Sequence, residues 1–122
     1  MRLKGLNCVV TGGGSGIGAA TVRRFVAEGA QVLIADIGME AADALAAELG
    51  SAVTTIRCDV QIEADVRAVA EAAYTRWDKV DVLVNNAGSE LNKAYDETTE
   101  DEWQRVINID LKGPWLMCKH IV

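Results

Sequence analysis

A glycine-rich stretch near the N-terminus constrains the fold more than any other part of this 122-residue chain. From Val9 to Ala19 the sequence reads VVTGGGSGIGA, so an apolar run leads into a dense cluster of glycines. Glycine permits the positive φ of a tight turn and lets backbone N–H groups approach a ligand closely. The stretch therefore predicts the end of a buried strand, a tight turn and the N-terminus of a helix, where a phosphate group can bind.

The rest of the chain alternates short apolar runs with segments of helical spacing. The predicted strands span residues 7–11, 31–35, 53–58 and 80–84, and the predicted helices span 15–28, 39–49 and 63–77. A fourth helix is expected to begin at the sequence TEDE, residues 99–102, which fits a capping box. Strands separated by helices of this length indicate a parallel sheet. Right-handed crossovers then give the strand order 3-2-1-4 with helices on both faces.

We expect residues 1–122 to form one doubly wound α/β domain of the Rossmann type, with its ligand crevice between the first and fourth strands. The composition excludes other classes of protein. A net charge of -6 without any basic run argues against a nucleic-acid or anionic-membrane surface. No apolar stretch has the length of a signal peptide or a membrane span. The three cysteines lack metal-site spacing and are typical of a reducing compartment, so we expect a cytoplasmic protein.

Asp36 narrows the choice of ligand. It follows the predicted strand 31–35 directly and lies 18 residues after Gly18. An acidic residue at this place accepts hydrogen bonds from the ribose hydroxyls of a dinucleotide and repels the 2′-phosphate of NADP. Neither Ile37 nor Gly38 supplies an arginine that would neutralise it. The pattern favours NAD over NADP, and the alternative is a loop aspartate that caps the next helix.

Two further loops follow predicted strands at the same edge of the sheet. Asp59 and Val60 come after the third strand and could flank an adenine ring, although Asp59 could equally cap a helix entry. The sequence NNAG, residues 85–88, comes after the fourth strand. Asparagine and glycine there indicate a turn with side-chain-to-backbone bonds, and this turn would lie at the mouth of the crevice.

Together these motifs resemble the classical short-chain dehydrogenase/reductase family, in unbroken order from Leu3 to Val122. The shared motifs are Thr11-Gly12-x-x-x-Gly16-x-Gly18, Asp36, Asp59-Val60, Asn85-Asn86-Ala87-Gly88 and Asn108. The resemblance implies an NAD-dependent oxidoreductase that transfers hydride between the nicotinamide and a secondary alcohol or ketone. The cofactor contacts that it implies are Gly12, Ser15, Gly16, Ile17, Gly18, Asp36, Asp59, Val60, Asn86, Ala87 and Gly88. It also implies that Asn108 kinks the long fourth helix and holds a water of a proton relay, whereas taken alone Asn108 could be a satisfied amide.

The sequence departs from the family at its catalytic pair. Complete members are about twice as long, and their catalytic serine and Tyr-x-x-x-Lys pair lie beyond the position of Val122. The tyrosines of this chain do not form the pair, because Tyr74 is followed four residues later by Asp78 and Tyr95 by Thr99. We therefore expect the 122 residues to bind cofactor without turning over substrate alone. The alternatives are a non-catalytic dinucleotide-binding module and half of a split or self-associating enzyme.

Other candidate residues receive structural interpretations. His120 is expected to be structural, and Trp103 and Trp115 to lie in the core or an interface. The acidic residues are expected to form a solvated surface rather than a metal site; they are Glu90, Asp96, Glu97, Glu100, Asp101 and Glu102. The stretch 108–122 is apolar around most of its circumference and the edge of the fourth strand has no partner, so we expect a homo-oligomer.

Overall fold

The computed structural model describes residues 1–122, and its four strands form one parallel sheet in the order β3-β2-β1-β4. The strands are β1 (Asn7–Thr11), β2 (Gln31–Asp36), β3 (Val53–Arg57) and β4 (Val82–Val84). Val10 on β1 lies in register with Ile34 on β2 and with Val84 on β4. The predicted strand order is confirmed.

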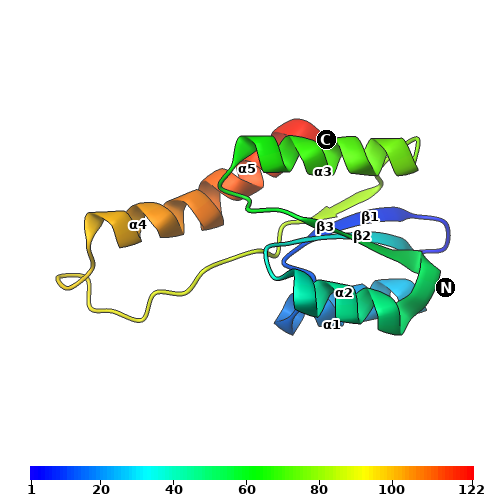
Figure 1. Cartoon of the computed structure of the whole chain (residues 1–122), viewed down its shortest axis with the longest axis horizontal. Helices are drawn as coiled ribbons and strands as arrows, with labels where there is room; N and C mark the ends of the chain where they lie inside the picture. The colour runs from blue at the N-terminus through cyan, green and yellow to red at the C-terminus, as the bar shows by residue number, and fades with distance from the viewer.

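Helices cover both faces of this sheet. They are α1 (Gly16–Ala27), α2 (Met39–Leu49), the 3-10 turn η1 (Gly50–Ala52), α3 (Glu63–Arg76), α4 (Glu100–Ile107), the π-helix η2 (Asn108–Lys112) and α5 (Gly113–Ile121). Figure 1 shows α1 and α2 on one face of the sheet and α3 and α5 on the other. The doubly wound architecture is therefore confirmed. No helix is long and apolar enough to cross a bilayer.

Alternation along the strands divides the core into two halves. Val9 and Leu33 point towards α3 and α5, where they pack with Val66 and Met117 among other buried residues. Val10 and the other side chains of opposite parity pack against α1 and α2. Side chains in a strand alternate between faces, so a central parallel strand with helices on both sides is apolar throughout. Cys8 and Cys58 are buried in these clusters, whereas Cys118 is exposed.

Element boundaries differ from the predictions by one or two residues. β4 begins at Val82 rather than at residue 80. The side chain of Asp81 explains the shift, because its Oδ2 accepts a hydrogen bond from the backbone N–H of Asn7 at 2.9 Å. The carboxylate thereby links the residue before β4 to the first residue of β1, one position before the two strands begin to pair. Gly29, which follows α1, adopts a φ of 93°, as expected of a glycine that ends a helix.

Residues 88–112, the α4 segment, extend away from the sheet (Figure 1). The predicted capping box is present, with Thr99 Oγ1 accepting from the N–H of Glu102 at 3.2 Å and the Glu102 carboxylate accepting from the N–H of Thr99 at 3.3 Å. No residue of α4 itself is buried. Trp103 is 56% exposed and Trp115 is 58% exposed, so the core placement considered for both was wrong.

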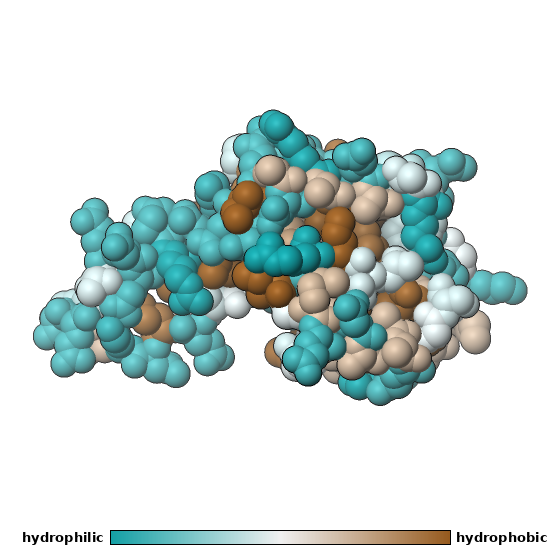
Figure 2. Space-filling view, in the orientation of Figure 1, coloured by the Kyte–Doolittle hydropathy of each residue, from teal (hydrophilic) through white to brown (hydrophobic).

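The end of the chain returns to the sheet through α5. Leu116, Met117 and Ile121 are buried against the cluster that includes α3. Leu111 and Trp115 remain exposed, so the expected apolar surface around this stretch is covered on one side only. In Figure 2 the α4 segment shows a largely hydrophilic surface, while hydrophobic atoms are visible between it and the rest of the molecule.

Candidate functional site

The glycine turn lies at the carboxyl end of β1, and its glycines are needed for two different reasons. Gly12 and Gly16 adopt φ values of 63° and 53°, which L side chains rarely tolerate. Gly18 has no room for a side chain, because a Cβ there would collide with the carbonyl group of Gly12 and the amide of Asn86. Helix α1 therefore begins in direct contact with Gly12 and Asn86.

The N-terminus of α1 presents unpaired backbone donors. Its N-cap residue, Ser15, makes no side-chain capping bond. The first N–H of the region with a helical partner is that of Ala19, which donates to Ser15 O, and no protein acceptor faces the N–H groups of Gly16, Ile17 and Gly18. Ser15 and Ile17 are exposed. A helix N-terminus with free donors and glycines beside it suits the pyrophosphate of a dinucleotide.

Asp36 lies at the end of β2 and holds two loops in place. Its Oδ2 accepts from the N–H of Gly14 at 2.8 Å, and its Oδ1 accepts from the N–H of Gly38 at 2.8 Å. Gly38 is the N-cap of α2, and α2 has no side-chain capping bond. Asp36 therefore fixes the glycine turn relative to β2 rather than capping the next helix. Each carboxylate oxygen still has capacity for a further hydrogen bond from a ribose hydroxyl.

The loop after β4 is tied to β1 by side-chain-to-backbone bonds. The buried hydroxyl of Thr11 accepts from the N–H groups of Asn86 and Ala87, each at 3.0 Å. The side-chain amide of Asn86 donates to the carbonyl of Gly12 at 3.1 Å. These bonds place the predicted Asn86–Gly88 turn beside the glycine turn. Thr11 was identified only as part of a motif, and the structure shows that it organises the loop.

A cavity of about 420 Å³ is lined by five of the eleven predicted cofactor contacts. Its lining includes Asp36, Asp59, Val60, Ala87 and Gly88. The apolar residues of its lining suit a flat purine, and its two carboxylates suit polar hydroxyl groups. The structure thus brings together residues from the ends of β2, β3 and β4.

Asp59 also serves the local turn into α3. Its Oδ1 accepts from the backbone N–H of Gln61 at 3.0 Å and from the Gln61 amide at 3.3 Å. The helix-entry interpretation therefore holds together with a place on the cavity. Cys58, which also lines the cavity, is not a nucleophile at neutral pH, because burial, with Asp65 and Asp59 nearby, raises the pKa of its thiol to about 12.

Sequence reasoning missed Arg105 as a residue near the site. Arg105 lies on α4, far along the chain from Asp36, yet it lines the same cavity. No side chain of the structure forms an ion pair with it. Only the path of α4 brings Arg105 there, and no local pattern in the sequence indicates that path.

Asn108 and Asp110 occupy different surroundings in the π-helix η2. The Asn108 side-chain oxygen accepts from the amide of Gln104 at 2.8 Å, and Asn108 does not line the cavity. Asp110 Oδ1 instead accepts from the N–H of Ser89 at 2.9 Å and from its hydroxyl at 3.4 Å. The helix is irregular at Asn108, as predicted, with Pro114 in the first turn of α5. Asp110 was missed because its partner lies 21 residues away.

Two other features lie apart from this crevice. A larger groove, of about 640 Å³, runs beneath α4 and includes Leu91, Trp103 and Ile107, but none of the predicted cofactor residues. No three histidine, cysteine, aspartate or glutamate residues gather as metal ligands would. The candidate cofactor cavity is therefore smaller than this groove, and the chemistry of its lining rather than its size makes it the candidate.

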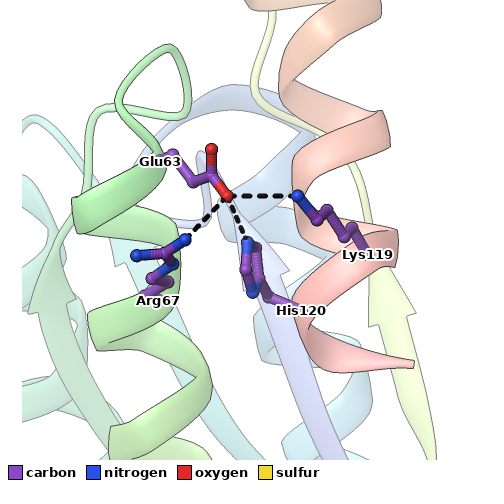
Figure 3. A network of polar contacts seen from close by, with 4 residues as sticks. All are labelled: Glu63, Arg67, Lys119 and His120. Carbon is purple, nitrogen blue, oxygen red and sulfur yellow. Dashed lines mark hydrogen bonds and ion pairs between the residues drawn. The ribbon is translucent and has the colours of Figure 1, made fainter.

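His120 belongs to a polar network between α3 and α5 (Figure 3). Its Nε2 lies 3.0 Å from Glu63 Oε1, and the same oxygen lies 3.3 Å from Lys119 Nζ and 3.2 Å from Arg67 Nη2. Hydrogen bonds from His120 and Lys119 lower the pKa of Glu63. The network holds the end of α5 against α3, which agrees with a structural role for His120.

A parallel sheet in the order 3-2-1-4, with a glycine turn after its first strand and an acidic residue after its second, defines a dinucleotide-binding α/β protein. The family model described as short chain dehydrogenase matches residues 7–122. The chain therefore belongs to the short-chain dehydrogenase/reductase family, and this family binds nicotinamide dinucleotides.

Curated relatives and solved structures agree with this placement. Momilactone A synthase of Oryza sativa subsp. japonica is 44% identical over 98% of this chain, and D-threitol dehydrogenase of Mycolicibacterium smegmatis is 37% identical over 98%. A 3-ketoacyl-(acyl-carrier-protein) reductase from Brucella melitensis, solved with NADH, is 33% identical, with a TM-score of 0.94 over 98% of this chain. The matches cover 44%, 47% and 50% of those proteins, so the chain spans about half their length.

Proposed function

We propose that residues 1–122 form the cofactor-binding unit of an NAD-dependent oxidoreductase that acts on a secondary alcohol or ketone. The free donors of Gly16, Ile17 and Gly18 at the start of α1 carry this proposal. The crowding at Gly18 supports it, because a turn needed only to reverse the chain would not require the helix to press on the Gly12 carbonyl. Bound there, the dinucleotide would supply a hydride donor or acceptor.

Each group of predicted contacts would bind a different part of the dinucleotide. The α1 N-terminus, with Ser15 and Ile17 at its rim, would hold the pyrophosphate. Asp36 would accept hydrogen bonds from the adenosine ribose, and Asp59 and Val60 would flank the adenine. The loop Asn86–Ala87–Gly88 would border the nicotinamide ribose. Asn108 is proposed to contribute to a proton relay; its side-chain oxygen accepts from Gln104 and has a second lone pair that could accept from a water.

NAD rather than NADP is the proposed cofactor because of the charge at the end of β2. Both oxygens of Asp36 are held by backbone N–H groups, which fixes the carboxylate where a 2′-phosphate would lie. Arg105 lines the same cavity and is the cation that could offset this repulsion. The ratio of NAD to NADP affinity therefore reports which of the two charges, Asp36 or Arg105, dominates.

The test is cofactor binding by the chain and by the variant Asp36→Ala. We expect saturating NAD to raise the melting temperature of the chain, because a ligand that binds only the folded state stabilises it. Asp36→Ala should weaken NAD binding about tenfold and reduce discrimination against NADP. Glu40→Ala, an exposed acidic substitution in the first turn of α2, is the control. The proposal fails if saturating NAD leaves the melting temperature of the unmodified chain unchanged.

Self-association and a cytoplasmic location complete the proposal. β4 pairs with β1 alone, and the exposed Trp103, Leu111 and Trp115 lie on consecutive parts of α4, η2 and α5. An open strand edge and apolar side chains of this kind favour a homo-oligomer. A single monomeric species in light scattering at high concentration would contradict it. Because these 122 residues carry no Tyr-x-x-x-Lys pair, we expect them to show no alcohol oxidation alone.

A further inference from the structure

The two ends of the α4 segment meet at the mouth of the crevice. The segment leaves the sheet at Gly88 and Ser89 and returns through η2, which contains Asp110. Asp110 Oδ1 lies 2.9 Å from the backbone nitrogen of Ser89 and 3.4 Å from its hydroxyl. A Cβ built on Gly88 would lie 3.6 Å from the same oxygen, so the carboxylate lies directly over this turn.

This contact completes a set of side-chain acceptors along the loop after β4. Thr11 Oγ1 holds the N–H groups of Asn86 and Ala87, and Asp110 holds that of Ser89. Loop peptides without secondary-structure partners depend on such bonds for their orientation. Thr11 is buried in the sheet and keeps its place whatever the α4 segment does. Asp110 is the acceptor that depends on η2.

We propose that Asp110 is a positioning residue for the nicotinamide end of the cofactor, acting through the peptide between Gly88 and Ser89. This inference rests on the proposed function, in which Asn86, Ala87 and Gly88 border the nicotinamide ribose. A carboxylate is an acceptor-only group, so it fixes a donor N–H towards η2 and turns the preceding carbonyl away. Asn108 makes no such contact, because its oxygen is held by Gln104.

The test compares two ligands that differ at the nicotinamide end. NADH reports on the whole site through its fluorescence, and ADP reports on the adenosine end alone through titration calorimetry. We expect Asp110→Ala to weaken NADH binding about fivefold, the effect of losing one hydrogen bond to an exposed charged acceptor, and to leave ADP affinity unchanged. The emission of bound NADH should also shift towards that of free NADH, because the ring is less firmly held.

Two further variants separate positioning from general destabilisation. Asp110→Asn keeps an oxygen that can accept from Ser89 N–H, so it should restore NADH affinity to within about twofold of the original. Asp101→Ala removes an exposed carboxylate elsewhere on the same segment and should change neither ligand. Equal losses of NADH and ADP, unchanged NADH binding in Asp110→Ala, or an Asp110→Asn as weak as Asp110→Ala would each overturn the assignment. If the unmodified chain bound neither ligand, the proposed function itself would fail, and this assignment with it.

Discussion

The sheet region (residues 1–87 and 113–122) and the α4 segment (residues 88–112) are held together by different interactions. All the buried hydrophobic residues of the chain lie in the sheet region, in two clusters on the two sides of the sheet. The α4 segment has none, and polar contacts such as Asp110–Ser89 and Thr99–Glu102 define it. Apolar burial contributes far more to stability than exposed polar contacts. The sheet region therefore sets the stability of the fold, and the exposed polar contacts of the α4 segment add little to it.

This difference also divides the candidate site. The proposed pyrophosphate and adenosine contacts belong to the sheet region, where backbone bonds and packing fix the residues. The proposed nicotinamide contacts belong to the loop after β4, and the proposed positioning residue Asp110 belongs to η2 in the α4 segment. Substitutions in the sheet region should therefore lower the free energy of unfolding, whereas substitutions in the α4 segment should weaken cofactor binding with little loss of stability.

The largest effect is expected for Gly18→Ala in the sheet region. The added methyl group would press on the Gly12 carbonyl and the Asn86 amide, so α1 has to move away from β1. We expect the free energy of unfolding to fall by about 3 kcal/mol, as in overpacked cores, with loss of NAD binding. Urea unfolding followed by circular dichroism measures the first, and titration with NAD the second.

Gly16→Ala is the matched control for that prediction. Gly16 has a positive φ, but a Cβ there meets nothing within 4 Å. Its cost should be that of the backbone conformation alone, about 1 kcal/mol. If the two variants proved equally stable, the close contact at Gly18 would not be the reason for the glycine.

A pair of large-to-small substitutions sharpens the comparison further. Met117 is fully buried on α5, and Met117→Ala should lower the free energy of unfolding by about 3 kcal/mol. Trp103, on α4, is the larger side chain but is 56% exposed, and Trp103→Ala should cost less than about 1 kcal/mol. Thermal unfolding at several protein concentrations provides the measurement. A cost for Trp103→Ala that grows with concentration would show that the α4 segment is buried in an oligomer.

The sheet region could be predicted from sequence because its signals are local and agree with one another. The apolar run before Gly12, the glycine turn and Asp36 each specify a position, and right-handed connections leave one strand order. The structure places Asp36, Asp59 and Ala87 on one cavity, as their places after successive strands required. Boundaries were less exact, because contacts such as Asp81 with Asn7 set them, 74 residues apart.

The α4 segment could be predicted only in its local features. The capping box at Thr99 depends on neighbouring residues and is present. The irregularity of the helix at Asn108 was implied by the resemblance to the family rather than by a local pattern. The contacts of Arg105 and Asp110 depend on the direction in which the segment leaves the sheet, and no periodicity encodes that direction. Trp103 and Trp115 were predicted to lie in the core or an interface, and their exposure contradicts the core alternative, whereas the interface alternative stays a prediction. Hydrophobicity indicates that a side chain is to be covered but does not indicate which chain covers it.

The smallest expected change in stability concerns the polar contacts of Glu63 on α3 with Lys119 and His120 on α5. Hydrogen bonds from His120 and Lys119 lower the pKa of Glu63 below its ordinary value of 4.5, so the ionised carboxylate stabilises the folded state at neutral pH. That stabilisation is lost as the pH falls from about 4.5 through the lowered value. Glu63→Gln should therefore melt slightly below the original chain at pH 7, and the difference should disappear in acid, once the pH lies below the lowered pKa of Glu63. Glu71→Gln, at an exposed position of the same helix, should show no such difference at either pH. A gap between Glu63→Gln and the original chain that persists unchanged at the lower pH would show that the charge of Glu63 does not hold α5 in place.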